Sequence, residues 1–122
     1  MPQIEVTEEG IRIIEEHLRN LPVNDDDPSE GNSLDQPHNQ EMLRRLRAGC
    51  RTPTDLRYYE HEILEAWLMG QDFTYRQAHD AVLKAQGLFY RGGDYRLYTP
   101  GARALSPTLF PPLNPSGPAP VP

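Results

Sequence analysis

The sequence has only one cysteine, no long hydrophobic run and no signal-like N-terminus. Because Cys50 has no second cysteine to pair with, an internal disulfide framework is excluded. No apolar stretch approaches the ~20 residues of a membrane-spanning helix, and the first residues lack the basic-then-apolar pattern of a secretory signal. We therefore expect a soluble chain with no membrane contact.

What the sequence does contain indicates one small domain with segments outside its core. Its 122 residues correspond to a single domain. Hydrophobic residues make up 37%, below the roughly 45–50% of typical globular proteins, and the 13 prolines are about twice the usual share. Part of the chain is therefore expected to lie outside the hydrophobic core.

Composition divides the chain into four segments. Residues 1–21 are expected to form an N-terminal strand, Ile4 to Val6, and a helix. Residues 22–38 are rich in Asp, Pro and Gly and predict an acidic flexible linker. Residues 39–105 predict a helical core with a β-hairpin. Residues 106–122 hold seven prolines and no charge, which predicts a disordered tail that could be a ligand for a protein partner.

Local patterns predict a mainly α fold, a small helical domain of about four helices with a short C-terminal β-hairpin. The helices are expected over residues 8–20, 40–48, 55–69 and 75–86. Their expected N-caps are Thr7, Asn39, Thr54 and Thr74. The hairpin is expected from Leu88 to Tyr98, with a Gly-Gly pair in its turn. The side chains expected to be buried are Ile11, Ile14, Leu18, Leu46, Tyr59, Ile63, Trp67, Val82 and Leu88.

Charge is distributed unevenly along the chain. Residues 1–41 have a net charge of −9, and residues 42–122 have a net charge of +3. The densest basic cluster consists of Arg44, Arg45, Arg47, Arg51 and Arg57. This cluster could bind phosphate or an acidic partner, or be a solvated surface that the acidic segment partly neutralises. The overall net charge of −6 argues against a nucleic-acid partner without excluding one.

One helix carries a dense group of residues suited to chemistry, in the pattern His-Glu-x-x-Glu. His61 and Glu65 are four residues apart, so on a helix their side chains lie one turn apart on one face. An imidazole and a carboxylate at this spacing can bind one divalent ion, and Glu62 could activate a water. His79 is the expected third ligand, because a short turn over 70–73 would bring the next helix back antiparallel. The pattern thus predicts a zinc site with Glu62 and His61 as catalytic residues.

The same residues allow other interpretations. The apolar residues of this helix suggest one broad inward face that His61 only borders, so His61 could be a packed structural residue. His61 paired with Glu62 or Glu65 could also act as a general base without metal. Tyr58 is a further catalytic candidate, whose alternative is a core aromatic ring. Cys50 lies between Gly49 and Arg51 but has no evident His partner, which favours an unreactive thiol.

Several motifs together resemble a known class of domains. They are Asp55-x-x-Tyr58-Tyr59-x-His61-Glu62-x-x-Glu65-x-x-Leu68-Met69, Tyr75-x-x-Ala78-His79 and Leu97-Tyr98-x-Pro100. This combination resembles the C-terminal toxin domains of bacterial polymorphic toxins of the Rhs and filamentous-haemagglutinin kinds. The resemblance implies a small α-rich effector for interbacterial competition, carried by a secreted protein into a rival's cytoplasm and paired with a cognate immunity protein. The delivery region is not in this sequence, so the chain would be an excised domain, an orphan cassette or a relative with another use.

Three functions remain open from the sequence. The first is an effector that is a metal-dependent hydrolase built on His61, Glu65 and His79. The second is a metal-independent, nuclease-like toxin that uses His and Glu as acid and base. The third is a non-enzymatic protein-interaction module.

Overall fold

A computed structural model describes residues 5–24, 26–89 and 93–111 and confirms the mainly α class. Its α-helices are α1 (Glu8–Arg19), α2 (Pro37–Arg47), α3 (Pro53–Met69), α4 (Tyr75–Ala85) and α5 (Pro100–Ala104). The connections in these ranges contain the 3-10 helices η1 (Pro28–Glu30), η2 (Ser33–Asp35) and η3 (Gly93–Leu97). Within these described ranges, no helix has the length and apolarity needed to cross a bilayer.

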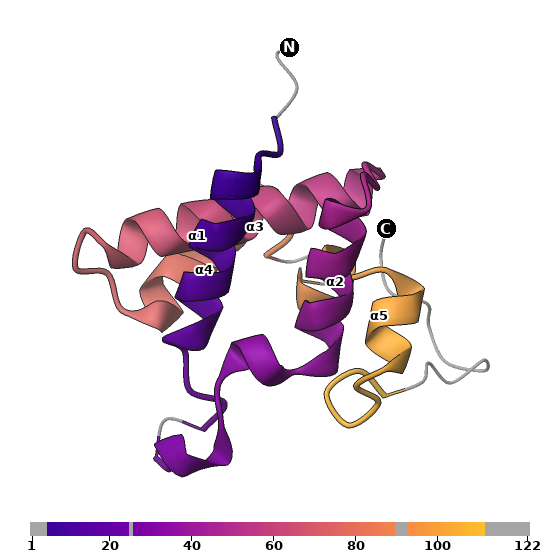
Figure 1. The fold of residues 1–122 in the computed structure, drawn as a ribbon. Coiled ribbons are helices and arrows are strands. Elements are labelled where there is room, and N and C mark those ends of the chain that lie inside the picture. Colours follow the sequence, from indigo (N-terminus) through magenta and orange to yellow (C-terminus); the bar gives the residue numbers. More distant parts are fainter. Residues whose placement is uncertain (1–4, 25, 90–92, 112–122) are drawn as a thin grey trace.

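Helix α3 is the centre of the arrangement, with α1 and α4 packed against it (Figure 1). Helix α1 crosses α3, and α4 returns antiparallel to α3 after the short turn that follows Met69. Asp72 in this turn has a φ of 68°, a conformation that Asp tolerates better than most residues. Helix α2 contacts α1, α3 and α5.

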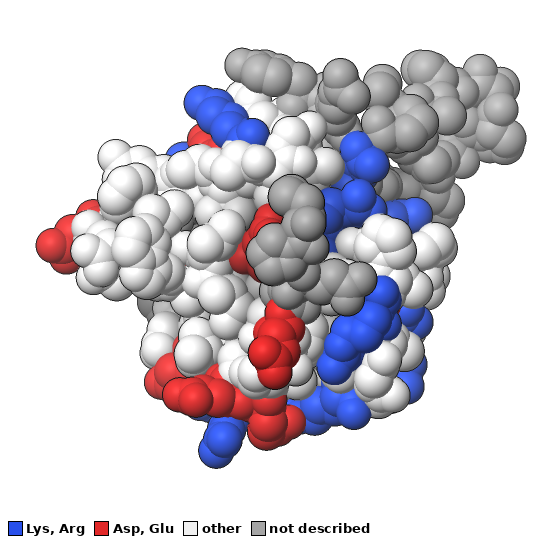
Figure 2. Space-filling model, turned by 90° about the horizontal axis from the view of Figure 1, so that it is seen from above, with Lys and Arg blue, Asp and Glu red and all other residues white. Residues whose placement is uncertain are grey.

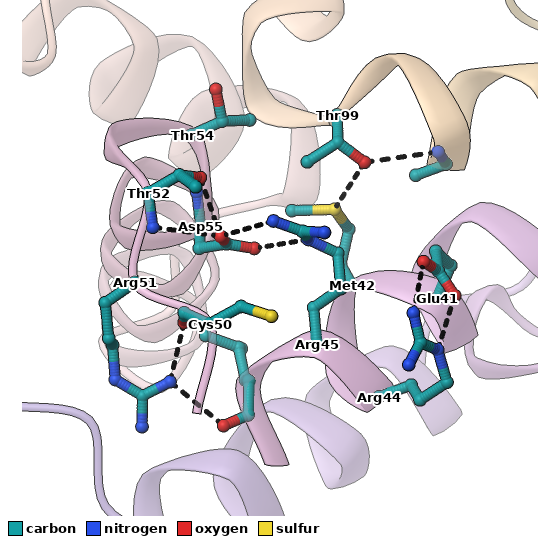
Figure 3. Close-up of polar contacts among 12 residues, drawn as sticks. Glu41, Met42, Arg44, Arg45, Cys50, Arg51, Thr52, Thr54, Asp55 and Thr99 are labelled. Atoms are coloured by element: carbon teal, nitrogen blue, oxygen red, sulfur yellow. Dashed lines mark hydrogen bonds and ion pairs between the residues drawn. The ribbon is translucent and has the colours of Figure 1, made fainter. Parts of the chain in front are cut away.

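The helix ends follow local capping chemistry. The Thr7 side chain accepts a hydrogen bond from the Gly10 backbone, and Thr74 and Gln77 form the expected capping box at the start of α4. At α3, however, the cap is Thr52 rather than the expected Thr54, because Asp55 completes a capping box with Thr52 (Figure 3). Helix α2 begins at Pro37, before the expected Asn39 cap.

The main core joins α1, α2 and α3. Its buried residues are Ile11, Ile14, Leu18, Leu21, Met42, Leu43, Leu46, Tyr58, Tyr59 and Ala102. A smaller cluster of Leu83, Leu88 and Leu97 packs between α4 and η3. Burial is therefore confirmed for the predicted core residues of α1, for Leu46 and Tyr59, and for Val82 and Leu88.

Helix α3 turns its polar side inward, which overturns the predicted apolar face. Trp67, expected in the core, is 62% exposed, and Ile63 is only partly buried. In their place Asp55, His61, Glu62 and Glu65 are buried. The reason is that α1 and α4 pack on the side of α3 that carries the His-Glu-x-x-Glu pattern. Buried charged groups in place of available apolar ones are a sign of a functional site.

Other expectations for the chain ends and connections differ from the structure. The expected strand at Ile4 to Val6 begins outside the described residues, and Glu5 and Val6 are not in a strand. The hairpin turn over 90–92 also lies outside the described residues, and the expected second arm forms the 3-10 helix η3 instead. The expected linker contains η1 and η2, with an isolated bridge between Pro22 and Asn32.

The first residues of the expected tail pack on the fold. Phe110 is buried, and its ring meets those of His38, Tyr95 and Tyr98. Ser106 exchanges a hydrogen bond of 2.8 Å with Nδ1 of His38. The part of the tail beyond residue 111 lies outside the described residues.

Gly10 marks a close approach between α1 and α3 that predicts a mutational effect. A Cβ at this position would meet the Tyr59 hydroxyl and lie 2.7 Å from its ring carbon Cζ. We expect Gly10→Ala to lower the free energy of unfolding by about 1–3 kcal/mol, as overpacking does, despite the better helix propensity of Ala. Urea unfolding measures this loss, and Gly10→Ala combined with Tyr59→Phe should recover part of it. A Gly10→Ala protein as stable as the wild type would contradict the packing.

Candidate metal centre

Three side chains from two helices converge on one point, as their spacing predicts. Nε2 of His61 lies 2.9 Å from Oε2 of Glu65, one turn further along α3. Nδ1 of His79, from α4, lies 2.9 Å from the same oxygen and 3.1 Å from Nε2 of His61. All three residues are buried, and their ligand atoms are close enough together to hold one metal ion.

Outer contacts favour one donor nitrogen on each imidazole. The carboxylate of Asp94 only accepts hydrogen bonds, so Nε2 of His79, 2.8 Å from Oδ1 of Asp94, is the donor in that contact. Nδ1 of His61 lies 3.1 Å from Oε1 of Gln86, whose amide nitrogen donates to the carbonyl of Arg57. In neutral rings, the remaining nitrogens would both present lone pairs to Glu65.

These three ligand atoms have nearly the spacing that one tetrahedral cation needs. Two imidazole lone pairs and a carboxylate oxygen repel one another unless positive charge lies among them. A proton is shared between two atoms, whereas one metal ion can contact Nε2 of His61, Nδ1 of His79 and Oε2 of Glu65 together. Neighbouring ligands of a tetrahedral ion with bonds of about 2.0–2.1 Å lie about 3.3–3.4 Å apart. The observed separations of 2.9 to 3.1 Å need only a small expansion.

The pKa values also show that the cluster favours positive charge on its imidazoles. Burial would lower the pKa of His79, but its hydrogen bonds with Asp94 and Glu65 outweigh burial and raise the pKa to about 10. For Glu65, burial favours a higher pKa, but hydrogen bonds from His17, His61 and His79 outweigh it and lower the pKa well below its usual value. A bound metal would displace the protons from the imidazoles.

Glu62 is a buried carboxylate of this cluster whose hydrogen bonding is incomplete among the described residues. It is 4% exposed, and its Oε2 has no hydrogen-bond partner among the described residues. Burial first, and then the neighbouring charge of Glu65, raises the pKa of Glu62 to about 7. A group with such a pKa can both accept and release a proton near neutrality.

A cavity of about 400 Å³ gives access to the cluster. It borders on Glu62, Glu65, His79 and Asp94, and the ring of Tyr75 stacks on His79 at its edge. Its other walls are largely aromatic or uncharged and polar, and they include His38, Asn39, Gln36, Ser33, Tyr95, Tyr98 and Phe110. Among its described lining residues there is no Lys or Arg.

The predicted basic cluster lies elsewhere and is largely engaged in other contacts. Figure 2 shows Lys and Arg gathered on the side where α2 and the start of α3 lie. Arg47 pairs with Glu8 and Glu15, and Arg45 with Asp55. Arg51 donates to two backbone carbonyls (Figure 3). These contacts favour the interpretation of this cluster as a structural and solvated surface.

Tyr58, the other predicted catalytic residue, packs in the core. It is fully buried, its hydroxyl donates to Oδ1 of Asn39, and burial raises its pKa well above the usual range. These contacts favour the core-aromatic alternative for Tyr58.

Sequence reasoning missed three residues of the cluster: His17, Gln86 and Asp94. Nε2 of His17, on α1, lies 2.8 Å from Oε1 of Glu65. A signal for His17 was present, since it follows Ile14 by three residues and lies on the same buried face of α1. Gln86 lies at the end of α4 and Asp94 in η3. At these positions no periodic sequence pattern predicts which way a side chain points.

Comparisons of the chain with known protein families, with curated proteins and with solved structures found no match.

Proposed function

We propose that this chain is a metal-dependent hydrolase that holds a zinc ion with His61, Glu65 and His79. The observation that carries this proposal is the convergence of their three ligand atoms, with both imidazoles oriented by outer hydrogen bonds. Two His and one Glu form a donor set of catalytic zinc sites, which keep a further position for water or substrate. The cavity beside Glu65 and His79 would give that position access.

In this proposal Glu62 is the general base. Its buried carboxylate lines the same cavity and has an oxygen without a hydrogen-bond partner among the described residues. It would take a proton from the water that attacks the substrate and later return it to the leaving group. Asp94 and Gln86 keep the imidazoles in the tautomers that a metal ligand needs. A bound zinc ion would polarise the substrate and lower the pKa of the water to about 7.

We further propose that the hydrolase serves as an antibacterial effector, on the basis of the sequence resemblance to polymorphic-toxin domains. Residues of the resembling motifs line the site or pack next to it, since Tyr75 stacks on His79 and Tyr98 borders the cavity. In that setting the substrate lies in the cytoplasm of a rival bacterium, and an immunity protein protects the producer.

The test combines elemental analysis with expression in a bacterial host. Purified wild-type chain is expected to contain zinc at one ion per chain or more, and its expression to arrest growth. Glu62→Gln, which has nearly the same shape, should keep at least one ion and relieve the arrest, because loss of a general base slows a reaction by about 10²–10⁴-fold. Asp80→Asn is the matched control: it also neutralises an acid, next to His79 in sequence, but within the described part of the chain its ion pair is with Arg76.

Each alternative function has its own outcome in this test. Metal-free protein that still arrests growth through Glu62 would support metal-independent acid–base chemistry and contradict the zinc site. An arrest that Glu62→Gln leaves unchanged, with no metal bound, would support an interaction module instead.

A further inference from the structure

The two oxygens of Glu65 face two different groups of side chains. Oε2 contacts His61 and His79, as described above. Oε1 points to the other side, where Nε2 of His17 lies 2.8 Å away. Glu65 is 1% exposed, so water satisfies neither oxygen to any extent. Glu65 is thus placed between two clusters, one formed with α4 and one with α1.

The cluster on the α1 side has its own unsatisfied atom. Among the described residues, Oε2 of Glu62 has no hydrogen-bond partner, and Nε2 of His17 lies 3.6 Å from it. A buried carboxylate oxygen without a donor carries a large desolvation cost. His17, Glu62 and Glu65 offer three ligand atoms that lie within 4.8 Å of one another. A cation among them would give Oε2 of Glu62 the partner that it lacks.

We propose that the chain binds a second divalent cation between His17, Glu62 and Glu65, so that Glu65 bridges two ions. This inference rests on the proposed first ion, since the bridge requires both. Paired ions of this kind in hydrolytic enzymes lie about 3.5–4 Å apart. The second ion has one nitrogen and two oxygen ligands, a set that suits Zn²⁺ or Mn²⁺.

The second ion would change the role of Glu62. Bound through Oε2, Glu62 would be a ligand rather than the general base, and the second ion would join the first in lowering the pKa of the bound water. It would also supply positive charge to a cavity whose described lining has no Lys or Arg. An anionic substrate group would then be held by the ions rather than by side chains.

The deciding experiment counts ions on the full-length chain. Metal-stripped protein is titrated with Zn²⁺, and the bound ions are counted by calorimetry and native mass spectrometry. We expect two ions per wild-type chain and one per His17→Ala chain. His38→Ala is the control, because His38 lies at the same cavity but bonds to Ser106 instead of the cluster, and it should still bind two. Circular dichroism checks that each variant is folded.

The outcomes separate the two proposals. One ion on both the wild type and His17→Ala would overturn the second site and leave the first intact. No ion on the wild type would overturn both. If His17→Ala does not fold, Glu62→Gln decides the question with a side chain of nearly equal shape, since it removes a ligand of the second ion alone and should bind one.

Discussion

Glu65→Gln is expected to remove metal binding and growth arrest together. Glu65 contacts His17, His61 and His79, so a single substitution affects every imidazole of the cluster. The amide of Gln keeps the shape but carries no charge, and its NH₂ group must face either His17 or the other two rings. Loss of an outer partner of a ligand already costs 10–100-fold in metal affinity, so we expect a loss of more than about 100-fold here.

Zinc titration of the metal-stripped variant measures this effect. Asp80→Asn again serves as the control with a matched loss of one carboxylate, and it should bind zinc as the wild type does. Because Glu65 also joins α1 to α3, thermal unfolding of the variant must be followed in parallel. Folded Glu65→Gln protein with undiminished zinc affinity would refute the metal centre at its central residue.

The parts of the fold that depend on short-range chemistry were predictable. The N-caps at Thr7 and Thr74 could be predicted, because a capping bond joins a side-chain oxygen to a backbone N–H only three residues further along the chain. Gly87, with a φ of 73°, takes the left-handed conformation expected just after a helix. The same holds for His61 and Glu65, whose proximity follows from helix geometry alone.

The inward face of α3 was not predictable, because apolar residues occur all around this helix. The sequence pattern placed Ile63 and Trp67 on one apolar face, with Leu64 widening it, but α1 and α4 pack on a different side of the helix. The choice depends on partners far along the chain, as the 48-residue separation of His17 and Glu65 illustrates. His17, on the apolar face of α1, is the sequence feature that indicates a partner for the acids of α3.

The second arm of the expected hairpin forms a 3-10 helix for a related reason. Tyr95 to Tyr98 has the composition of a strand, but a strand needs a partner, and none is available to it among the described residues. Instead, η3 buries Leu97 against Leu83 and Leu88. It also brings Asp94 to His79, so this 3-10 helix connects the small apolar cluster with the candidate metal centre.

The largest expected effect on stability comes from the ion pair that joins α2 to the start of α3. Asp55 is fully buried and accepts two hydrogen bonds of 2.8 Å from Nε and Nη2 of Arg45 (Figure 3). It also accepts from the backbone and hydroxyl of Thr52. Asp55→Asn leaves the Arg45 charge partly buried without its partner, and we expect it to lower the free energy of unfolding by about 3 kcal/mol at neutral pH.

The pH dependence of this loss identifies the charge as its cause. Burial raises the pKa of Asp55, but the hydrogen bonds from Arg45 and Thr52 outweigh burial and lower the pKa below its usual value. A carboxylate with a lowered pKa stabilises the fold above its unfolded pKa of about 3.9 and loses this contribution as the pH falls through the folded value. The gap between wild type and Asp55→Asn, measured by urea unfolding, should therefore narrow as the pH falls below about 4.

Two controls complete this test: a solvent-exposed ion pair of the same kind, and the zinc content of the Asp55→Asn protein. Glu41→Gln breaks a bidentate pair with Arg44, whose side chain is 63% exposed, and should change stability much less. Asp55 makes no contact with the candidate metal ligands among its described hydrogen bonds, so folded Asp55→Asn protein should bind zinc normally. Equal losses for Glu41→Gln and Asp55→Asn would mean that burial of the Asp55 charge has no energetic weight, and the anchoring of α3 on α2 would need another cause.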